Sequence, residues 1–421
     1  MARAITRRTF LAATTAAGAA VAVQAPAPRA QGPTIKIGVI SPVTGALAEV
    51  GQDCRLGAQM AADAINAAGG IKSQGGARIE LLLADSQTRA DVARAEADRL
   101  VSGGAQLLTG AFHSAHVAGI APLAQQRRVP YIIDISAADA ITANVAKSVR
   151  EGQQKLQFVY RIFPGSATFG KNAVRYMTEI FREAGVAPKR IVLMYTNDLF
   201  GKTATEGYLA AHKAAAAAFE IVDVIPYPET AVDLSTEVSR AKAAKPEVLA
   251  PFTRPATAIL LLDELVKQRV ELMGVISPGA PGLYETKQIE QLKERIEYVM
   301  DLTVWPNMRL PRTQQLAAEY VKRSAGRNFD ASAVYTYEAI LVMVDVLERA
   351  GSTDPDALVA AIKATRFAGG VTTSTGPVVF NELGDNPNAS TAAIQILGGK
   401  PRVVWPKDAA ETKFVFPRPK V

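Results

Sequence analysis

Residues 34–70 read "TIKIGVISPVTGALAEVGQDCRLGAQMAADAINAAGG", and the rest of the chain repeats the pattern that this stretch begins. Residues 34–40 form a short run rich in β-branched side chains, which favours a β-strand. Residues 51–70 carry a helical pattern that ends on two glycines, which are common at helix C-termini because they adopt left-handed backbone angles without strain. A buried strand followed directly by a helix predicts the first half of a βαβ unit.

This alternation of strand and helix patterns continues along most of the chain. Apolar runs that predict strands stand at residues 77–86, 105–112, 129–136, 189–197, 219–227, 246–253 and 271–278. Helical patterns separate them at residues 89–104, 114–128, 170–185, 203–218, 233–245 and 256–268. Strands that are almost entirely apolar and are joined by single helices indicate parallel sheets with helices on both faces.

The pattern restarts after residues 157–166, which predicts a second α/β lobe of similar layout. Further helices are expected at residues 311–327, 331–351 and 354–366, and hairpin-type strands at 376–380 and 392–406, with a turn at "GGKP". The predicted fold class is therefore α/β, with two Rossmann-like lobes between which the chain passes more than once. Open parallel sheets bind ligands beyond the carboxyl ends of their strands, so a binding crevice is expected between the lobes.

The N-terminus has the pattern of a bacterial export leader. Arg7 and Arg8 precede a weakly apolar, Ala-rich stretch that is too short to span a membrane. A twin-arginine signal peptide is predicted over residues 1–30, with cleavage after Ala30 or Ala25. Its removal takes away four arginines and lowers the formal net charge from +7 to about +3. A nucleic-acid partner, which requires clustered basic residues, is therefore not expected, and the protein is predicted to be periplasmic.

The chain offers few residues for disulfide, metal or cofactor chemistry. Cys54 is its single cysteine, so no internal disulfide can form, and a buried, inert thiol is expected. His113 and His116 are three residues apart, a spacing that puts both on one helical face. No Cys cluster or HExxH motif supplies the further ligands that a zinc site needs. No metal site and no cofactor are predicted.

Residues 107–116, "LLTGAFHSAH", place a serine and two histidines where a predicted strand gives way to a helix. Ser114 falls in the first helical turn, where unpaired backbone N–H groups and the helix dipole attract anions. We expect Ser114 to bind the ligand and His113 to face the crevice. The alternatives are that Ser114 only caps the helix and that His113 is a buried polar side chain.

Thr253 and Arg254 stand at a second junction of this kind, just before Pro255. A guanidinium at the mouth of the crevice would bind a carboxylate through two parallel hydrogen bonds, and a solvated arginine is the alternative. The "GKT" at residues 201–203 does not mark a phosphate-binding loop, because Thr196 stands where that motif requires its first glycine.

Four segments, residues 35–71, 78–101, 129–142 and 190–204, closely resemble periplasmic substrate-binding proteins of the leucine/isoleucine/valine-binding type. The resemblance extends from residue 34 to about residue 406 and implies a type I periplasmic binding protein. Such proteins have two lobes joined by a hinge of three crossovers, close on a small molecule and then dock on the permease of an ABC importer. The implied N-terminal lobe comprises residues 34–161 and 306–372, and the C-terminal lobe comprises residues 162–305 and 373–412.

The resemblance also implies site residues. Ser114 matches the serine that binds the ligand carboxylate, and Ala137 and Ala138 match a second carboxylate-binding turn. Asp139 stands where the leucine-binding proteins have threonine. Its interpretations are a cap for the following helix, or a contact to a ligand ammonium or hydroxyl group. Phe200 matches an aromatic residue that covers the ligand, and a core contact is its alternative.

Residues 274–285, "GVISPGAPGLYE", lack the acid with which the amino-acid binders of the family hold the α-ammonium group. Ser277, Pro278 and Gly279 stand near that place instead. A buried ammonium group without a carboxylate partner would be poorly compensated. The expected ligand is therefore a small carboxylate, either an amino acid or, in better agreement with this segment, an aromatic or aliphatic acid without an α-amine. Trp305 and Tyr335 are candidates for the wall of an apolar pocket or for the core.

The predicted function is the solute-binding component of an ABC importer, acting as a monomer and not as an enzyme. A periplasmic ligand sensor for a membrane receptor would have the same lobes and is the main alternative. A periplasmic hydrolase is less well supported, because no GxSxG motif occurs and the histidines lack an evident set of catalytic partners.

Overall fold

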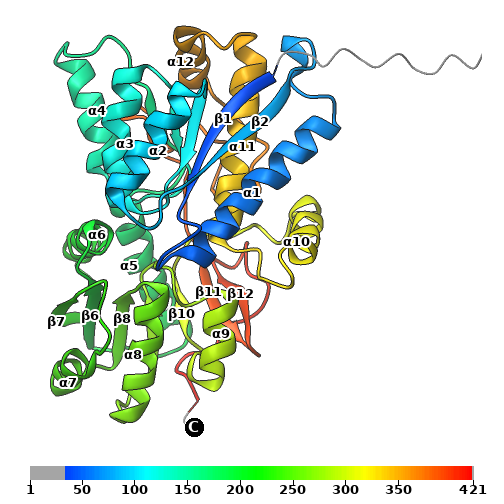
Figure 1. The fold of residues 1–421 in the computed structure, drawn as a ribbon. Helices are drawn as coiled ribbons and strands as arrows, with labels where there is room; N and C mark the ends of the chain where they lie inside the picture. The colour runs from blue at the N-terminus through cyan, green and yellow to red at the C-terminus, as the bar shows by residue number, and fades with distance from the viewer. Residues whose placement is uncertain (1–33, 420–421) are drawn as a thin grey trace, which may run out of the picture.

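The computed structural model describes residues 34–419, and the predicted signal peptide at residues 1–30 lies outside them. Two separate sheets organise this part of the chain, each flanked by helices (Figure 1). None of the described helices combines the length and the hydropathy needed to cross a membrane.

The first sheet has five parallel strands in the order β2-β1-β3-β4-β5. These strands are β1 (Thr34–Ser41), β2 (Arg78–Asp85), β3 (Leu107–Gly110), β4 (Tyr131–Ile133) and β5 (Val159–Arg161). The connecting helices are α1 (Ala48–Ala67), η1 (Lys72–Gln74), α2 (Ala90–Ser102), α3 (Ser114–Arg127) and α4 (Ala140–Arg150).

The second sheet has seven strands in the order β12-β11-β10-β9-β8-β6-β7. Its parallel strands are β6 (Arg190–Thr196), β7 (Glu220–Tyr227), β8 (Val248–Phe252), β9 (Gly274–Ser277) and β10 (Met300–Asp301). The antiparallel hairpin of β11 (Ala393–Leu397) and β12 (Lys400–Trp405) extends it at one edge. The accompanying helices are α5 (Ser166–Glu183), α6 (Leu199–Ala215), α7 (Ser235–Ala243), α8 (Pro255–Lys267), α9 (Thr286–Leu292) and η2 (Lys293–Arg295).

The chain passes between the two sheets three times within the described residues: between β5 and α5, after β10, and before β11. The middle passage leads to α10 (Pro311–Arg323), α11 (Ala331–Ala350) and α12 (Pro355–Lys363). Helix α11 packs along α1 beside the first sheet, as Figure 1 shows. The fold class of two Rossmann-like lobes is thus confirmed, while the exact lobe boundaries remain a prediction.

Burial explains why the sequence pattern was informative. Every residue of β3, β8 and β9 is buried, so these strands are continuous apolar runs rather than alternating ones. Small residues bring the helices close together: a Cβ added to Gly57 in α1 would lie 2.2 Å from the carbonyl oxygen of Ala333 in α11. The thiol of Cys54 is buried, as expected.

The later part of the chain differs from the prediction at residues 376–380 and at two short elements. Residues 376–380 do not form a strand, because only an isolated bridge joins Val378 to Phe367. The hairpin at residues 392–406 is present, with its turn at Gly398 and Gly399, which both have positive φ. Helix α9 and the two-residue strand β10 were not predicted, because both are shorter than the window over which periodicity can be recognised.

Candidate ligand-binding site

A cavity lies between the two lobes, with about 450 Å³ of empty space that is partly open to solvent. Its aromatic walls are Phe112, Phe163, Phe169, Phe200 and Tyr284, and its other lining residues are Ser114, Ile135, Ser136, Ala137, Arg254, Gly279, Ala280, Pro281, Thr303, Val304 and Ala331. Ser114, Ala137, Phe200, Arg254 and Gly279 are thus the sequence-predicted residues that meet at one cavity.

The turn between β3 and α3 brings the N-terminal lobe to this cavity. Gly110, Ala111 and Phe112 all have positive φ, and a Cβ on Gly110 would lie 2.0 Å from the carbonyl oxygen of Ile40. Left-handed angles cost a residue with a side chain about 1–2 kcal/mol. The tight turn sets Phe112 against the cavity and starts α3 directly at its edge.

Hydrogen-bond donors without protein partners gather at this edge. His113 is the N-cap of α3, since its Nδ1 accepts from the N–H of Ala115 at 3.3 Å, and Ser114 is the first helical residue. The interpretation of Ser114 as the cap is therefore wrong. Ser136 donates its hydroxyl hydrogen to the Ser114 hydroxyl oxygen at 3.1 Å, which leaves the Ser114 hydroxyl hydrogen free. Within residues 34–419, the N–H groups of Ser114 and Ala137 also make no hydrogen bond.

The C-terminal lobe contributes the one charged side chain that lines the cavity among the described residues. The Arg254 guanidinium lies 4.7 Å from the centroid of the Phe200 ring, a cation–π arrangement, and its Nε donates to Asp198 at 2.9 Å. Thr253 is not part of the wall, because its buried hydroxyl donates to the carbonyl oxygen of Pro281 at 2.9 Å. Arg254 is only 5% exposed, so the solvated alternative is wrong.

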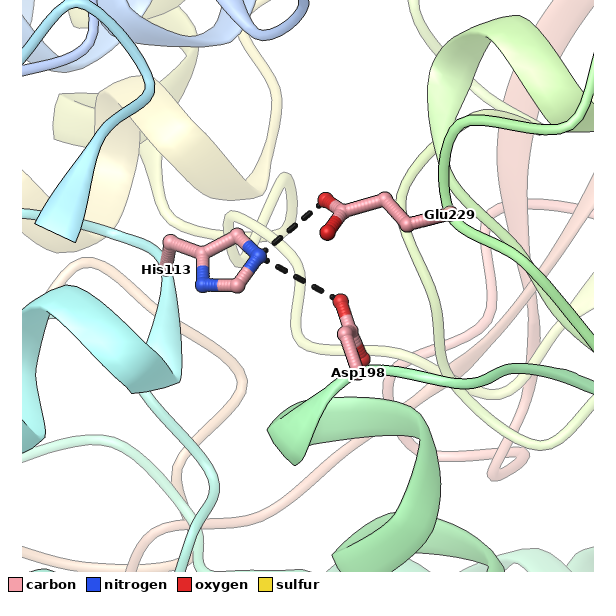
Figure 2. A group of neighbouring side chains, drawn as sticks. All are labelled: His113, Asp198 and Glu229. Atoms are coloured by element: carbon pink, nitrogen blue, oxygen red, sulfur yellow. Dashed lines mark hydrogen bonds and ion pairs between the residues drawn. The ribbon is translucent and has the colours of Figure 1, made fainter.

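A network of charged groups joins the two lobes beside the cavity (Figure 2). The Nε2 of His113 lies 3.1 Å from a Glu229 carboxylate oxygen and 3.3 Å from one of Asp198. Arg254 Nε lies 3.6 Å from the same Glu229 oxygen. His113, Asp198 and Arg254 are almost fully buried, whereas the Glu229 side chain is 29% exposed.

The pKa shifts follow from these contacts. Burial raises the pKa of Asp198, but the Arg254 charge and hydrogen bonds from His113, Gly201 and Arg254 outweigh burial and lower it. For His113, burial and the Arg254 charge lower the pKa, but the hydrogen bonds to Asp198 and Glu229 and the Glu229 charge outweigh them and raise it. Burial raises the pKa of Glu229 as well, but the His113 hydrogen bond and the Arg254 charge outweigh burial and lower it. Asp198 and Glu229 are therefore both ionised near neutral pH.

The same three side chains also bear on the question of a metal site. One ligand atom from each of His113, Asp198 and Glu229 falls within 4.8 Å of the others. The Arg254 guanidinium already supplies positive charge to Asp198 and Glu229, so a cation there would be repelled. His116 is not in this group: its ring stacks on His113 at 4.8 Å, and burial and the neighbouring His113 lower its pKa to about 4.

Asp139 and Ala138 do not line the cavity. The Asp139 carboxylate pairs with Arg161 at 3.0 Å and accepts from the backbone N–H of Ala167 at 2.9 Å, in the first turn of α5. It makes no capping bond to α4, so its interpretation as a cap for the following helix is wrong. The carboxylate instead joins the two lobes at the first crossover.

Two acids lie behind the cavity wall, and none of its described lining residues is an aspartate or glutamate. Burial raises the pKa of Glu285 to about 8, although the carboxylate accepts hydrogen bonds from the N–H groups of Gly282 and Tyr284. Burial likewise raises the pKa of Asp301, whose Oδ1 accepts from Ala280 N–H. Neither acid belongs to the cavity lining, since backbone N–H groups behind the wall bind both carboxyl groups.

Several site residues were not found from the sequence. Phe112, Ser136, Phe163, Phe169 and Tyr284 line the cavity, and Glu229 completes the charge network. Ser136 stands directly before Ala137 at the end of a predicted strand, which was a usable signal. Glu229 follows β7 in an ordinary polar loop, and no local pattern distinguished it. Trp305 and Tyr335 pack behind the wall, where they contact the rings of Tyr284 and Phe163.

Two α/β lobes linked by three crossovers, with a partly open cavity between them, have the architecture of a hinged solute-binding protein. A family model described as periplasmic binding protein matches residues 34–400, and the chain belongs to this family. Among its relatives, the Leu/Ile/Val-binding protein homolog 8 of Brucella abortus (strain 2308) is 24% identical over 390 residues, which cover 91% of this chain and 93% of the relative. The recognition of a type I binding protein of this group is thus confirmed.

Solved structures agree on the fold. A leucine-binding protein from Thermotoga maritima gives a TM-score of 0.73 at 20% identity, with 88% of this chain and 97% of the other covered. A solute-binding protein from R. palustris in complex with benzoate gives 0.72 at 19% identity, covering 90% and 100%. A branched-chain amino acid-binding protein from Streptococcus pneumoniae in complex with isoleucine gives 0.72 at 18% identity, covering 87% and 97%. The same fold therefore serves both amino acids and aromatic acids.

Proposed function

We propose that the protein is the periplasmic solute-binding component of an ABC importer for a small aromatic carboxylate that lacks an α-ammonium group. The observation that carries this proposal is the charge of the cavity wall: among its described residues, one cationic side chain and several free donors face a cavity without a carboxylate. The affiliation with the periplasmic binding proteins supports the transport role.

The carboxylate of the ligand is assigned to the start of α3. The N–H groups of Ser114 and Ala137 and the free hydroxyl hydrogen of Ser114 supply three donors to one small region. Ser114 also sits at the positive end of a helix of 14 residues. Preorganised donors of this kind bind an anion strongly because a buried carboxylate needs hydrogen bonds to replace its water.

The body of the ligand is assigned to the aromatic part of the cavity. Five aromatic rings line a small volume, which suits a flat ring better than a long aliphatic chain. An amino acid is less well accommodated, because its ammonium group would find no ionised acid among the described lining residues and a guanidinium, Arg254, on the wall.

Gly279 supports this assignment, because the absence of a side chain there leaves room for a ligand in the cavity. Its φ is +117°, and an added Cβ would lie 2.6 Å from the Phe169 ring and 2.9 Å from the carbonyl oxygen of Leu302. Any side chain at this position would be strained and would press on a cavity wall. Glycine is therefore required for the shape of the site.

A binding screen tests this function. The protein without residues 1–30 is mixed with benzoate, 4-hydroxybenzoate, phenylacetate, isovalerate, leucine and phenylalanine, and stabilisation is measured by thermal shift and then by calorimetry. We expect aromatic acids to raise Tm and the two amino acids to leave it unchanged. Tight binding of leucine, with no response to the aromatic acids, would overturn the proposed ligand class. Recovery of the compound unchanged after prolonged incubation distinguishes a binding protein from a hydrolase.

A further inference from the structure

The side-chain partners of Glu229 point to a device that acts on closure. Glu229 lies in the loop after β7, in the C-terminal lobe, and its nearest partner is the His113 Nε2 of the other lobe, at 3.1 Å. Arg254, the cation of its own lobe, is farther away at 3.6 Å and donates twice to Asp198. In the open form, the charge of Glu229 is therefore less well compensated than that of Asp198, until closure brings His113 next to it.

The charges within the C-terminal lobe show what closure supplies. Arg254 contributes one positive charge, whereas Asp198 and Glu229 contribute two negative charges. His113 comes from the N-terminal lobe and presents its Nε2–H toward an oxygen of each carboxylate (Figure 2). Its Nδ1 is engaged as the acceptor of Ala115 N–H, which fixes the hydrogen on Nε2 in the neutral ring and sets its direction.

We propose that His113 is an interlobe latch, which donates from α3 to Asp198 and Glu229 and thereby stabilises the closed form over the bound carboxylate. The latch acts at the same turn that holds the ligand, because His113 and Ser114 are adjacent residues at the start of α3. It also steadies Arg254 at the cavity wall, since Asp198 binds both the latch and the guanidinium. His113 and Asp198 are positioning residues in this scheme and need not touch the ligand.

The groups that face His113 are few. His116 stacks on it from its own helix, and Asp198, Glu229 and Arg254 approach from the C-terminal lobe. In an open cleft, the contacts to Asp198 and Glu229 are broken while the hydrogen bond to Ala115 remains. The latch therefore contributes to ligand affinity but not to the stability of the ligand-free open form.

The test replaces His113 with a residue that still caps α3 but is too short to contact the C-terminal lobe. Asparagine is a strong N-cap and can accept from Ala115 N–H, but it is too short to reach Glu229. His113→Asn is compared with Glu229→Ala, with the double variant, and with His212→Asn as a matched control. His212 lies in α6 and bonds only to the carbonyl oxygen of Phe219. Kd and dissociation rate are measured with benzoate, 4-hydroxybenzoate, isovalerate and leucine, alongside the Tm of each ligand-free protein.

We expect His113→Asn and Glu229→Ala each to weaken binding about 10-fold, mainly through faster dissociation. The loss in the double variant should be clearly smaller than the product of the two single losses, because both variants remove the same His113–Glu229 contact. The ligand-free Tm should stay at the parent value, and His212→Asn should bind as the parent does. Parent-like affinity of His113→Asn, or additive losses in the double variant, would overturn the latch while leaving the proposed function intact. Because the latch rests on that function, absence of binding to all four compounds would overturn both.

Discussion

The two walls of the cavity would hold the proposed carboxylate by different means. The N-terminal lobe presents neutral donors, namely the Ser114 hydroxyl and the backbone N–H groups of Ser114 and Ala137. The C-terminal lobe presents a full charge, Arg254, which two carboxylates already compensate. Burying a neutral donor costs much less free energy than burying a charge, and a buried charge is stable only while its ion-pair partners remain. Under the proposed function, the neutral donors of the N-terminal lobe bind the ligand carboxylate, and the charged groups of the C-terminal lobe make the stability of the closed form depend on pH.

The largest expected effect is at Arg254, the charged residue of the C-terminal wall. Arg254→Met leaves Asp198 buried without its cation, so we expect the affinity for benzoate to fall by about 100-fold or more. The ligand-free Tm should also fall, because the Arg254–Asp198 pair lies within one lobe and is present in the open form. Calorimetry and thermal melts of the same preparations measure both effects. An unchanged Tm would show that Asp198 does not depend on Arg254.

A smaller effect is expected from the neutral wall. Ser114→Ala removes one hydroxyl donor but keeps the backbone N–H groups, so binding should weaken about 10-fold. The ligand-free Tm should remain nearly unchanged, because His113 and not Ser114 caps α3. Titration calorimetry with the best aromatic acid measures this change. Equal affinity in variant and parent would remove Ser114 from the site.

The charged wall also predicts a modest pH dependence. The pKa of His113 is raised in the closed form, while in an open cleft it approaches the ordinary value of about 6.5. Protonated His113 therefore stabilises the closed form fully when the pH is below its ordinary pKa. This stabilisation is lost as the pH rises through the raised pKa of the closed form. Protonation at Nδ1 breaks the hydrogen bond to Ala115, which limits the gain. We expect affinity to fall about three-fold from roughly pH 6 to roughly pH 8, and His113→Asn to abolish this slope.

The smallest effect on binding is expected at Asp139, the residue that departs from the leucine-binding pattern. Asp139→Asn weakens the pair with Arg161 and the bond to Ala167, both at the first crossover. Ligand affinity should therefore stay within about two-fold of the parent, and only Tm should decrease slightly. A larger loss of affinity for the same acids would show that Asp139 contributes to ligand binding.

The fold was accessible from the sequence because buried parallel strands such as β3 and β8 are continuous apolar runs bounded by helices. The site was accessible only where a strand ends and a helix begins, as at Ser114 and Arg254. Phe163 lies in the first crossover and Phe169 just beyond it, and which side chains meet at the cavity depends on how the lobes close. The role of Glu229 depends on a partner 116 positions away, so no local pattern could reveal it.

The close approach of α1 and α11 has a consequence for how the protein can be made and divided. Gly57 lies against Ala333, so the apolar side of α1 stays uncovered until a segment almost 280 positions later has been synthesised. Contacts at such separations close large chain loops and slow the folding of the lobe that needs them. If the chain is divided between these two helices and one part is expressed alone, we expect that fragment to expose an apolar surface and to aggregate. It would not be an independently folding lobe.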